Sequence, residues 1–174
     1  WKVNFTLSGA PKAFVEKIHR EQRNQVSVDG QAHDWLCPSH PENFQLEVES
    51  MLEVARKYAV DGLHFDYIRY PNRNHCYCAG CRERFEVQAG VTVADWPQDC
   101  YAGELREPYH AFRRRQITRL VAAVSREAKQ IKPEIEMKAK QYINMGYQRL
   151  FGYEVEGGGF EAFGNAPDNR VLKA

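Results

Sequence analysis

The sequence predicts an α/β fold in which parallel β-strands alternate with helices. Short apolar stretches, rich in β-branched and aromatic residues, alternate with longer stretches whose apolar residues recur every three or four positions. Turn residues separate them, and the run at 60–66 has the composition of a buried parallel strand. Strand and helix in this order favour a parallel sheet with right-handed crossovers. A barrel of eight such units needs about 250 residues, so this chain of 174 residues is expected to form part of one.

A strand over residues 1–7 and a helix over residues 11–22 are expected to form the first unit. The strand residues alternate in polarity toward a Ser-Gly-Ala-Pro turn, and the helix carries apolar residues at helical spacing between charged ones. The next segment contains an Asp29-Gly30 turn. It leads to Trp35-Leu36-Cys37-Pro38, which we place at the end of a second strand or extended segment.

The following helix has the clearest helical pattern in the chain. Ser39 and Glu42 have the Ser-x-x-Glu spacing of a capping box, in which the serine side chain caps the first helical turn. Apolar residues then recur at three and four positions: Phe44, Val48, Met51, Leu52, Ala55 and Tyr58. This helix leads directly into the strand at 60–66.

Three further elements are expected in the second half of the chain. A short helix covers about 78–88, a long helix covers about 108–130, and a short strand covers 135–139. Pro133 stops the long helix. The run Arg113-Arg114-Arg115 is expected on the solvated side of that helix, because a charge run usually faces water.

Composition limits the class of protein. The chain has 43% hydrophobic residues, enough for a core, and is expected to form one domain over residues 1–174 with a cysteine-containing insertion at about 72–100. Its 24 basic and 23 acidic residues give a net charge of +1, which argues against a nucleic-acid partner. No apolar run reaches the roughly 18 residues of a membrane span. Because the chain starts at Trp1 inside an expected strand, we expect it to be an excerpt of a longer protein.

The strand at 60–66 carries the first candidate functional residues. Leu63 and Phe65 are expected to face one layer, and His64 and Asp66 the other, because successive side chains of a strand point to opposite sides. Asp66 lies at the carboxyl end of the strand, before a loop with aromatic and cationic residues. Parallel α/β proteins keep their chemistry at the carboxyl ends of strands, so a site is expected there.

Two motifs resemble a known family. Residues 35–43, Trp-Leu-Cys-Pro-Ser-His-Pro-Glu-Asn, carry a Trp-x-x-Pro-x-x-Pro element, and residues 61–71 read Asp-Gly-Leu-His-Phe-Asp-Tyr-Ile-Arg-Tyr-Pro. Both resemble the bacterial glycoside-hydrolase-like barrel proteins of the "family 10 glycosylhydrolase" type, also called glycosyl hydrolase-like 10. With the helix between them, the motifs cover about residues 33–71. Agreement is weaker upstream and along the long helix, and the family pattern is not matched after about residue 135.

The resemblance implies a TIM-type barrel, a carbohydrate ligand and an extracellular or periplasmic location. It also implies glycosidic bond hydrolysis, with Asp66 as the principal catalytic carboxylate. Such hydrolysis normally uses two carboxyl groups. Glu154, Glu156 and Glu161 in the C-terminal part are candidates for the second one.

Five residues are candidates for contacts with sugar. His64 can hydrogen-bond a hydroxyl, and the planar fork of Arg69 suits bidentate contacts. Trp35, Tyr67 and Tyr70 offer flat ring faces. Each has an alternative role within the fold: His64 as an interior histidine, Arg69 as a brace on loop carbonyls, and the aromatic residues as packing groups.

The cysteines form a second candidate site. Cys78-x-x-Cys81 has the spacing with which two thiolates of one tight turn bind structural zinc. Cys37 and Cys76 are expected to complete the set at the same edge of the sheet, with His75 or Cys100 as substitutes. Disulfides are the alternative in an exported protein, although five cysteines leave one unpaired; free thiols are a third. The cluster is not expected to be catalytic, because four filled positions leave no place for an activated water.

Two classes of function remain open at the level of sequence. The first is a glycoside hydrolase acting on a polysaccharide or oligosaccharide, and the second is a non-catalytic carbohydrate-binding barrel with a zinc or disulfide loop. A carboxyl group on a neighbouring strand end, within pairing distance of Asp66, favours the enzyme. A zinc-stabilised interaction module is a third reading, which measurement of metal content would test.

Overall fold

A computed structural model describes residues 2–3, 5–65 and 68–139 of the chain. These residues form ten elements of secondary structure, five helices and five strands. In chain order they are β1 (Lys2–Val3), α1 (Lys12–Arg20), β2 (Asn24–Val26), β3 (Ala32–Leu36), α2 (Pro41–Lys57), β4 (Gly62–Phe65), α3 (Ala79–Ala89), α4 (Gln98–Tyr101), α5 (Arg106–Ile131) and β5 (Glu136–Ala139). The α/β class expected from the sequence is confirmed.

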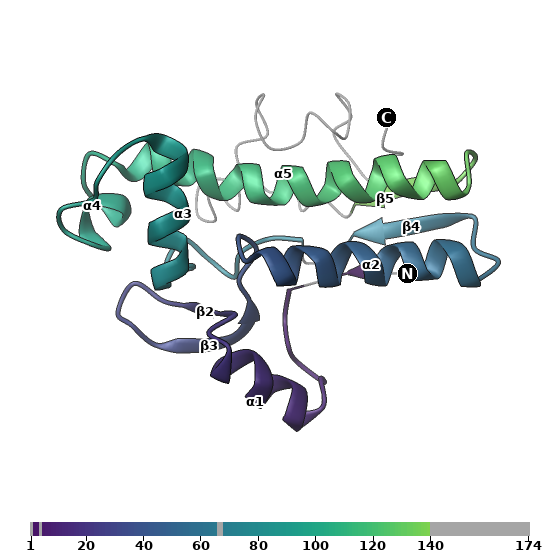
Figure 1. Ribbon diagram of the computed structural model, residues 1–174, viewed down its shortest axis with the longest axis horizontal. Coiled ribbons are helices and arrows are strands. Elements are labelled where there is room, and N and C mark those ends of the chain that lie inside the picture. The colour runs from purple at the N-terminus through teal and green to yellow at the C-terminus, as the bar shows by residue number, and fades with distance from the viewer. Residues whose placement is uncertain (1, 4, 66–67, 140–174) are drawn as a thin grey trace.

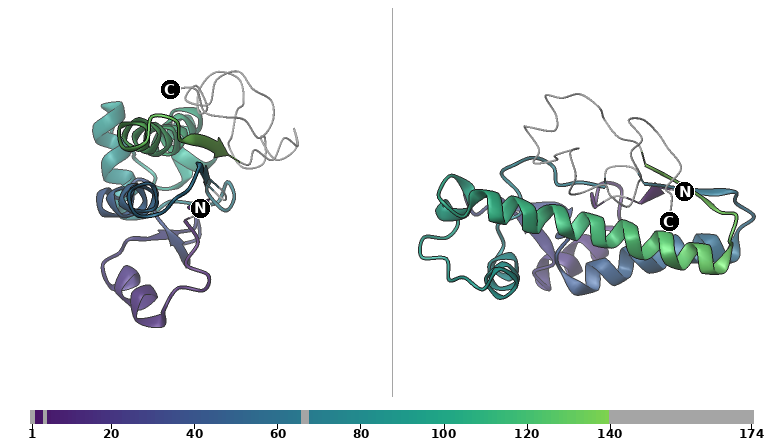
Figure 2. Two further views of the ribbon diagram at one scale, coloured as in Figure 1. Left: turned by 90° about the vertical axis from the view of Figure 1, so that its right-hand side faces the viewer. Right: turned by 90° about the horizontal axis from the view of Figure 1, so that it is seen from above.

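The main sheet is parallel, as predicted. Its strand order is β1-β4-β5, and β4 pairs in parallel with both neighbours, with Phe65 opposite Val3 and Ala139. Strands β4 and β5 approach closely at Gly62, where a Cβ atom would lie 2.9 Å from the Glu136 carbonyl oxygen. The first residue of β4 must therefore be glycine. Helices α2 and α5, which precede β4 and β5 in the chain, run side by side along one face of the sheet (Figures 1 and 2).

The core lies between this sheet and the two helices. Leu63 and Phe65 of β4 are 1% and 0% exposed, as expected for the strand face that packs on a layer. They belong to one cluster with the buried faces of both helices, including Met51, Leu52, Leu120, Val121 and Val124. Within the described part of the chain, no helix has the length and apolar character that crossing a membrane requires.

The segment from residue 24 to 36 differs from the expected parallel pattern. It forms an antiparallel hairpin of β2 and β3, separate from the main sheet. The predicted Asp29-Gly30 turn closes it: Gly30 has a φ of 82°, and the Ser27 amide donates to the Gln31 carbonyl at 2.8 Å. The pattern of polar and apolar residues along a strand does not distinguish parallel from antiparallel pairing. The pairing depends on which strand lies beside it in the folded protein.

Helix boundaries follow the sequence closely, but the cap of α2 does not. The prediction that Ser39 caps this helix is wrong. The N-cap is His40, whose Nδ1 accepts from the Glu42 amide at 3.3 Å. The hydroxyl of Ser39 contacts two cysteine sulfur atoms instead.

The expected position of the arginine run is also wrong at its first residue. Arg113 is 3% exposed and donates to the carbonyl oxygens of Asn72 and Arg73 at 3.0 and 3.2 Å. Its guanidinium lies 4.3 Å from the ring centroid of Tyr70. Arg113 therefore fastens the loop after β4 to helix α5. A run of three arginines in the sequence does not predict this role.

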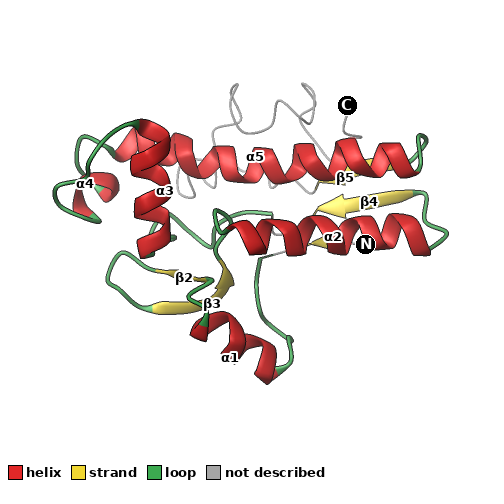
Figure 3. Cartoon of the chain, in the orientation of Figure 1, coloured by secondary structure: helices red, strands yellow, loops and turns green. Residues whose placement is uncertain are grey.

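Two insertions interrupt the alternation of strand and helix. The first follows β1 and contains α1 and the β2–β3 hairpin, and the second follows β4 and contains α3 and α4. Both lie beyond the end toward which the β4 arrow points (Figure 3). We call this end of the sheet, with the two insertions, the rim. The carboxyl end of β4 thus faces the part of the molecule that carries the cysteines.

A buried carboxyl group in α2 predicts a pH-dependent stability. Glu47 is 7% exposed, and burial raises its pKa from 4.5 to about 8. Between about pH 5 and pH 8 the unfolded chain therefore loses a proton that the folded chain keeps. The stability contributed by the neutral carboxyl is fully present below about pH 4.5 and is lost as the pH rises toward 8, by about 1 kcal/mol per pH unit.

Glu47→Gln is expected to remove this slope. Urea unfolding at about pH 5 and about pH 8 measures it, with Glu53→Gln as the control because Glu53 is an exposed residue of the same helix. Parallel pH profiles for the wild type and Glu47→Gln would contradict the assignment.

Candidate functional site

Four cysteines converge at the rim. The Sγ atoms of Cys37, Cys76, Cys78 and Cys81 all lie within 4.8 Å of one another. Cys37, Cys76 and Cys81 are completely buried, and Cys78 is 8% exposed. Cys37 belongs to the first insertion and the other three to the second, so the cluster joins two loops that are about 40 residues apart in the chain.

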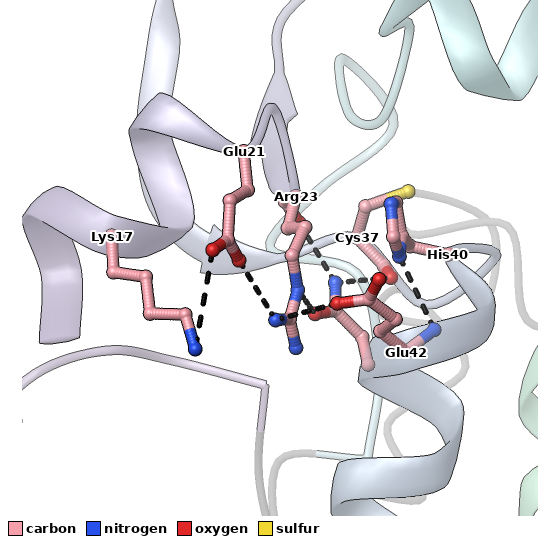
Figure 4. Close-up of polar contacts among 7 residues, drawn as sticks. Lys17, Glu21, Arg23, Cys37, His40 and Glu42 are labelled. Carbon is pink, nitrogen blue, oxygen red and sulfur yellow. Dashed lines mark hydrogen bonds and ion pairs between the residues drawn. The ribbon is translucent and has the colours of Figure 1, made fainter.

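Cys37 is held by contacts of its backbone. Its amide donates to the Arg23 carbonyl at 2.8 Å, and its carbonyl accepts from Asn43 Nδ2 at 3.0 Å. Arg23 is buried and pairs with Glu21 and Glu42, each at 3.0 Å, and its Nε donates to Asn43 at 2.9 Å (Figure 4). This network ties Cys37 to the first turn of α2 and to the end of α1.

The other three cysteines come from a segment laid against the hairpin. The Tyr77 amide donates to the Val26 carbonyl at 2.7 Å, and the Val26 amide donates to the Cys76 sulfur at 3.4 Å. Cys78 is the N-cap residue of α3, and the Cys81 amide donates to its carbonyl at 2.9 Å. This tight turn at a helix start points both sulfur atoms of Cys78-x-x-Cys81 to the same place.

The geometry of the cluster fits a tetrahedral metal ion. Zinc–sulfur bonds of about 2.3 Å place two sulfur atoms about 3.8 Å apart. The Cys37 sulfur lies 3.8 Å from that of Cys78 and 3.5 Å from that of Cys81. All five cysteines of the chain are free, and these separations exceed the roughly 2.05 Å of a disulfide bond. The four thiols therefore can hold a metal ion.

The pKa shifts of the clustered thiols also bear on cation binding. Hydrogen bonds from Cys76, Cys78 and Cys81 lower the pKa of Cys37 well below its ordinary value of 9.0. Burial raises the pKa of Cys76, and the hydrogen bond with Cys37 raises that of Cys81. Because a metal ion binds cysteine as the thiolate, a cation bound by these buried thiols would release their protons.

His75 and Cys100, the substitutes that the sequence left open, do not join the cluster. His75 Nδ1 lies 2.8 Å from Asn72 Oδ1, and burial lowers the pKa of His75 to about 4. Burial raises the pKa of Cys100 to about 12, so this thiol is neutral. Cys100 lies in α4 and is part of the packing of the insertion.

The predicted catalytic carboxylate lies outside the described residues. Asp66 follows the last residue of β4 in the sequence, and Asp66 and Tyr67 both belong to the part that the structure does not describe. Glu154, Glu156 and Glu161 are outside it as well. Their sequence predictions stay predictions.

The remaining sugar-contact candidates lie around the end of β4. His64 is half-buried within β4, and Trp35 is half-buried near the end of β3. The Arg69 guanidinium carbon lies 6.0 Å from the Trp35 ring centroid, so Trp35 of β3 and Arg69 of the loop after β4 are neighbours. Arg69 also donates to the carbonyls of Tyr70 and Pro71 at 3.2 and 2.9 Å, which is the bracing role that the sequence left open.

Tyr70 has the packing role that the sequence also left open. Its side chain is 2% exposed beneath Arg113, and burial raises its pKa well above 10.0. Its ring is part of the core, whereas Trp35 and Arg69 are partly accessible.

Sequence reasoning missed two polar neighbours of the cysteines. The Ser39 hydroxyl lies 3.2 Å from the sulfur atoms of both Cys37 and Cys81, and Arg84 Nε donates to it at 3.1 Å. Burial lowers the pKa of Arg84, but the negative charges of Cys37, Cys81 and Cys78 raise it on balance. Only the position of Arg84, three residues after Cys81, hinted at this contact.

Fold and site together define a parallel α/β protein whose strand-end loops are joined by a buried four-cysteine cluster. Residues 2–152 match the family model described as Glycosyl hydrolase-like 10. The chain belongs to this family. The match extends past residue 135, after which no agreement with the family was expected from the sequence. Comparison with curated proteins gave no match.

Solved structures share the fold at low sequence identity. A β-galactosidase from Bacillus circulans sp. alkalophilus has 16% identity and a TM-score of 0.57 over 76% of this chain. An α-L-fucosidase isoenzyme 2 from Paenibacillus thiaminolyticus has 19% identity and a TM-score of 0.56 over 83%. A β-galactosidase from Rahnella sp. R3 has 21% identity and a TM-score of 0.58 over 76%. The aligned parts are 25%, 20% and 24% of those chains, so this chain spans a minor share of the structures it resembles.

Proposed function

We propose that this chain is part of a glycoside hydrolase of the (β/α)8-barrel type that cleaves glycosidic bonds in a polysaccharide or oligosaccharide. The observation that carries the proposal is the Asp-Gly-Leu-His-Phe-Asp-Tyr-Ile-Arg-Tyr-Pro block at 61–71, in a chain that belongs to a glycosyl-hydrolase-like family. Its strand is central among the described strands of a parallel sheet, and the two insertions meet beyond its carboxyl end. That end is where parallel α/β enzymes place their catalytic groups.

In this proposal Asp66 acts as the acid or nucleophile, and a second carboxyl group acts with it. Trp35 and Arg69 bind the sugar beside it, since an indole face packs on the apolar side of a sugar ring and a guanidinium donates to hydroxyl or acidic groups. His64 and Tyr67 supply further contacts. Tyr70 supports Arg113 and the loop rather than the sugar, consistent with its burial.

We further propose that the four-cysteine cluster binds a structural zinc ion. Four thiolates are a complete tetrahedral ligand set and leave no position for an activated water. The cluster connects the loop that follows Trp35 and β3 with the loop that follows Arg69. Its role is therefore to hold two neighbouring loops of the rim in register, and the glycosidic chemistry uses no step at the metal.

A screen of the full-length protein against a panel of polysaccharides and aryl glycosides tests the proposed activity. Release of reducing ends or aryl alcohol from at least one glycan is the expected result. Binding to a glycan in affinity electrophoresis without any release would favour the non-catalytic carbohydrate-binding barrel. Absence of both would contradict a carbohydrate function.

A further inference from the structure

We propose that Ser39 and Arg84 form an outer shell of the metal centre that stabilises its negative charge and sets how tightly the protein retains the ion. The inference rests on the proposed metal binding and goes beyond it, because neither residue is a metal ligand. It starts from a serine that the capping pattern of α2 predicts at a helix end and that instead turns its hydroxyl toward sulfur.

The position of the Ser39 hydroxyl determines the direction of its hydrogen bonds. Its oxygen lies 3.2 Å from the sulfur atoms of Cys37 and Cys81, and Ser39 is 2% exposed. Cysteines that bind a metal are thiolates without a proton, so the single hydroxyl hydrogen must point to one of these two sulfur atoms. The oxygen then has lone pairs free to accept, and Arg84 Nε donates to it at 3.1 Å.

The side chain of Arg84 is fixed against the turn that carries two of the ligands. A Cβ atom at Gly80 would lie 2.7 and 2.9 Å from the two terminal nitrogens of Arg84. The end of the guanidinium therefore lies close against the backbone at Gly80, between Cys78 and Cys81. It is half-buried, and arginine keeps its positive charge at all relevant pH values.

Charge explains why such a shell is needed. Four thiolates and one divalent ion carry a net charge of −2, and the four cysteines are 0% to 8% exposed. Buried charge is costly unless it is paired and hydrogen-bonded. Arg84 supplies a compensating positive charge, and its donation to Ser39 strengthens the hydroxyl as a donor to sulfur. Removing either residue leaves the four ligands in place but weakens the stabilisation of the thiolate form.

Transfer of zinc from the full-length protein to a chromogenic chelator tests the proposal. Ser39→Ala and Arg84→Gln are expected to weaken zinc retention by about 10- to 100-fold, the usual effect of removing an outer-shell partner. Arg84→Lys is expected to recover part of the loss, because it restores the charge without the planar fork. Arg82→Gln is the matched control, since Arg82 lies in the same helix but bonds to Glu86 and the Val93 carbonyl, and it should retain zinc within about twofold of the wild type.

Two further measurements distinguish this role from a general effect on folding. The cobalt-substituted Ser39→Ala and Arg84→Gln proteins should keep the sulfur-to-cobalt absorption of four thiolates, and the metal-free forms should unfold at the same urea concentration as metal-free Arg82→Gln. Equal zinc retention in all variants would overturn the proposal while leaving the metal site intact. A wild-type protein that holds no zinc would overturn the proposed metal binding itself.

Discussion

Replacing Cys78 by alanine is expected to abolish zinc binding and to lower the melting temperature of the full-length protein by about 6 °C or more. Three remaining cysteines hold zinc much more weakly, and the thiols would be left buried without the ion that neutralises them. The loss is then at least about 3 kcal/mol, and each kcal/mol lowers the melting temperature by about 2–4 °C for a domain of this size. Removing the ion from the wild type with a strong chelator should have the same effect.

Cys100→Ala is the matched control for this experiment. Cys100 is also completely buried within an insertion, but it lies outside the four-cysteine cluster. Its replacement removes one buried sulfur and should cost about 1–2 kcal/mol, with the zinc content unchanged. Elemental analysis and thermal unfolding of both variants provide the comparison. If Cys78→Ala keeps its zinc, or unfolds like Cys100→Ala, the cluster has no structural metal.

Asp66→Asn is expected to lower the rate of glycoside hydrolysis by about 10²- to 10⁴-fold, with the fold unchanged. The amide has nearly the shape of the carboxyl group, but it can neither transfer a proton nor act as the nucleophile. The measurement is kcat/KM on the best substrate of the glycan screen, together with the melting temperature. Binding of the glycan should persist, because Trp35 and Arg69 are untouched.

Asp61→Asn serves as the control for this variant. Asp61 belongs to the same sequence block but lies exposed immediately before β4, where its carbonyl accepts from the Glu136 amide at 2.9 Å. Its side chain is a turn residue, so the rate should stay within about twofold of the wild type. Unchanged turnover in Asp66→Asn would remove this carboxylate from the mechanism.

The sequence predicted well those elements whose stability depends on local pattern. Helices α2 and α5 and strand β4 follow from apolar periodicity and turn residues, and their parallel arrangement follows from strand-helix alternation. The four-cysteine set could also be predicted, because the Cys78-x-x-Cys81 spacing is a local signal and the loops that follow parallel strands emerge at one edge.

Other features depend on contacts between distant parts of the chain. The short sequences of β2 and β3 do not determine whether each strand pairs in parallel or antiparallel, because that depends on which strand lies beside it in the fold. The Ser-x-x-Glu pattern at Ser39 predicts a contact within its own helix. The Ser39 hydroxyl instead contacts the sulfur of Cys81, which lies 42 positions further along the chain. Arg113 looks like a surface residue until the loop carbonyls of Asn72 and Arg73 are placed opposite it.

Zinc-edge X-ray absorption of the purified full-length protein tests the central claim most directly. If the rim is fastened by the four cysteines, the spectrum should show one zinc per chain with four sulfur neighbours at about 2.3 Å. Nitrogen or oxygen atoms in the first coordination shell, or a protein free of metal after purification without chelators, would contradict the account.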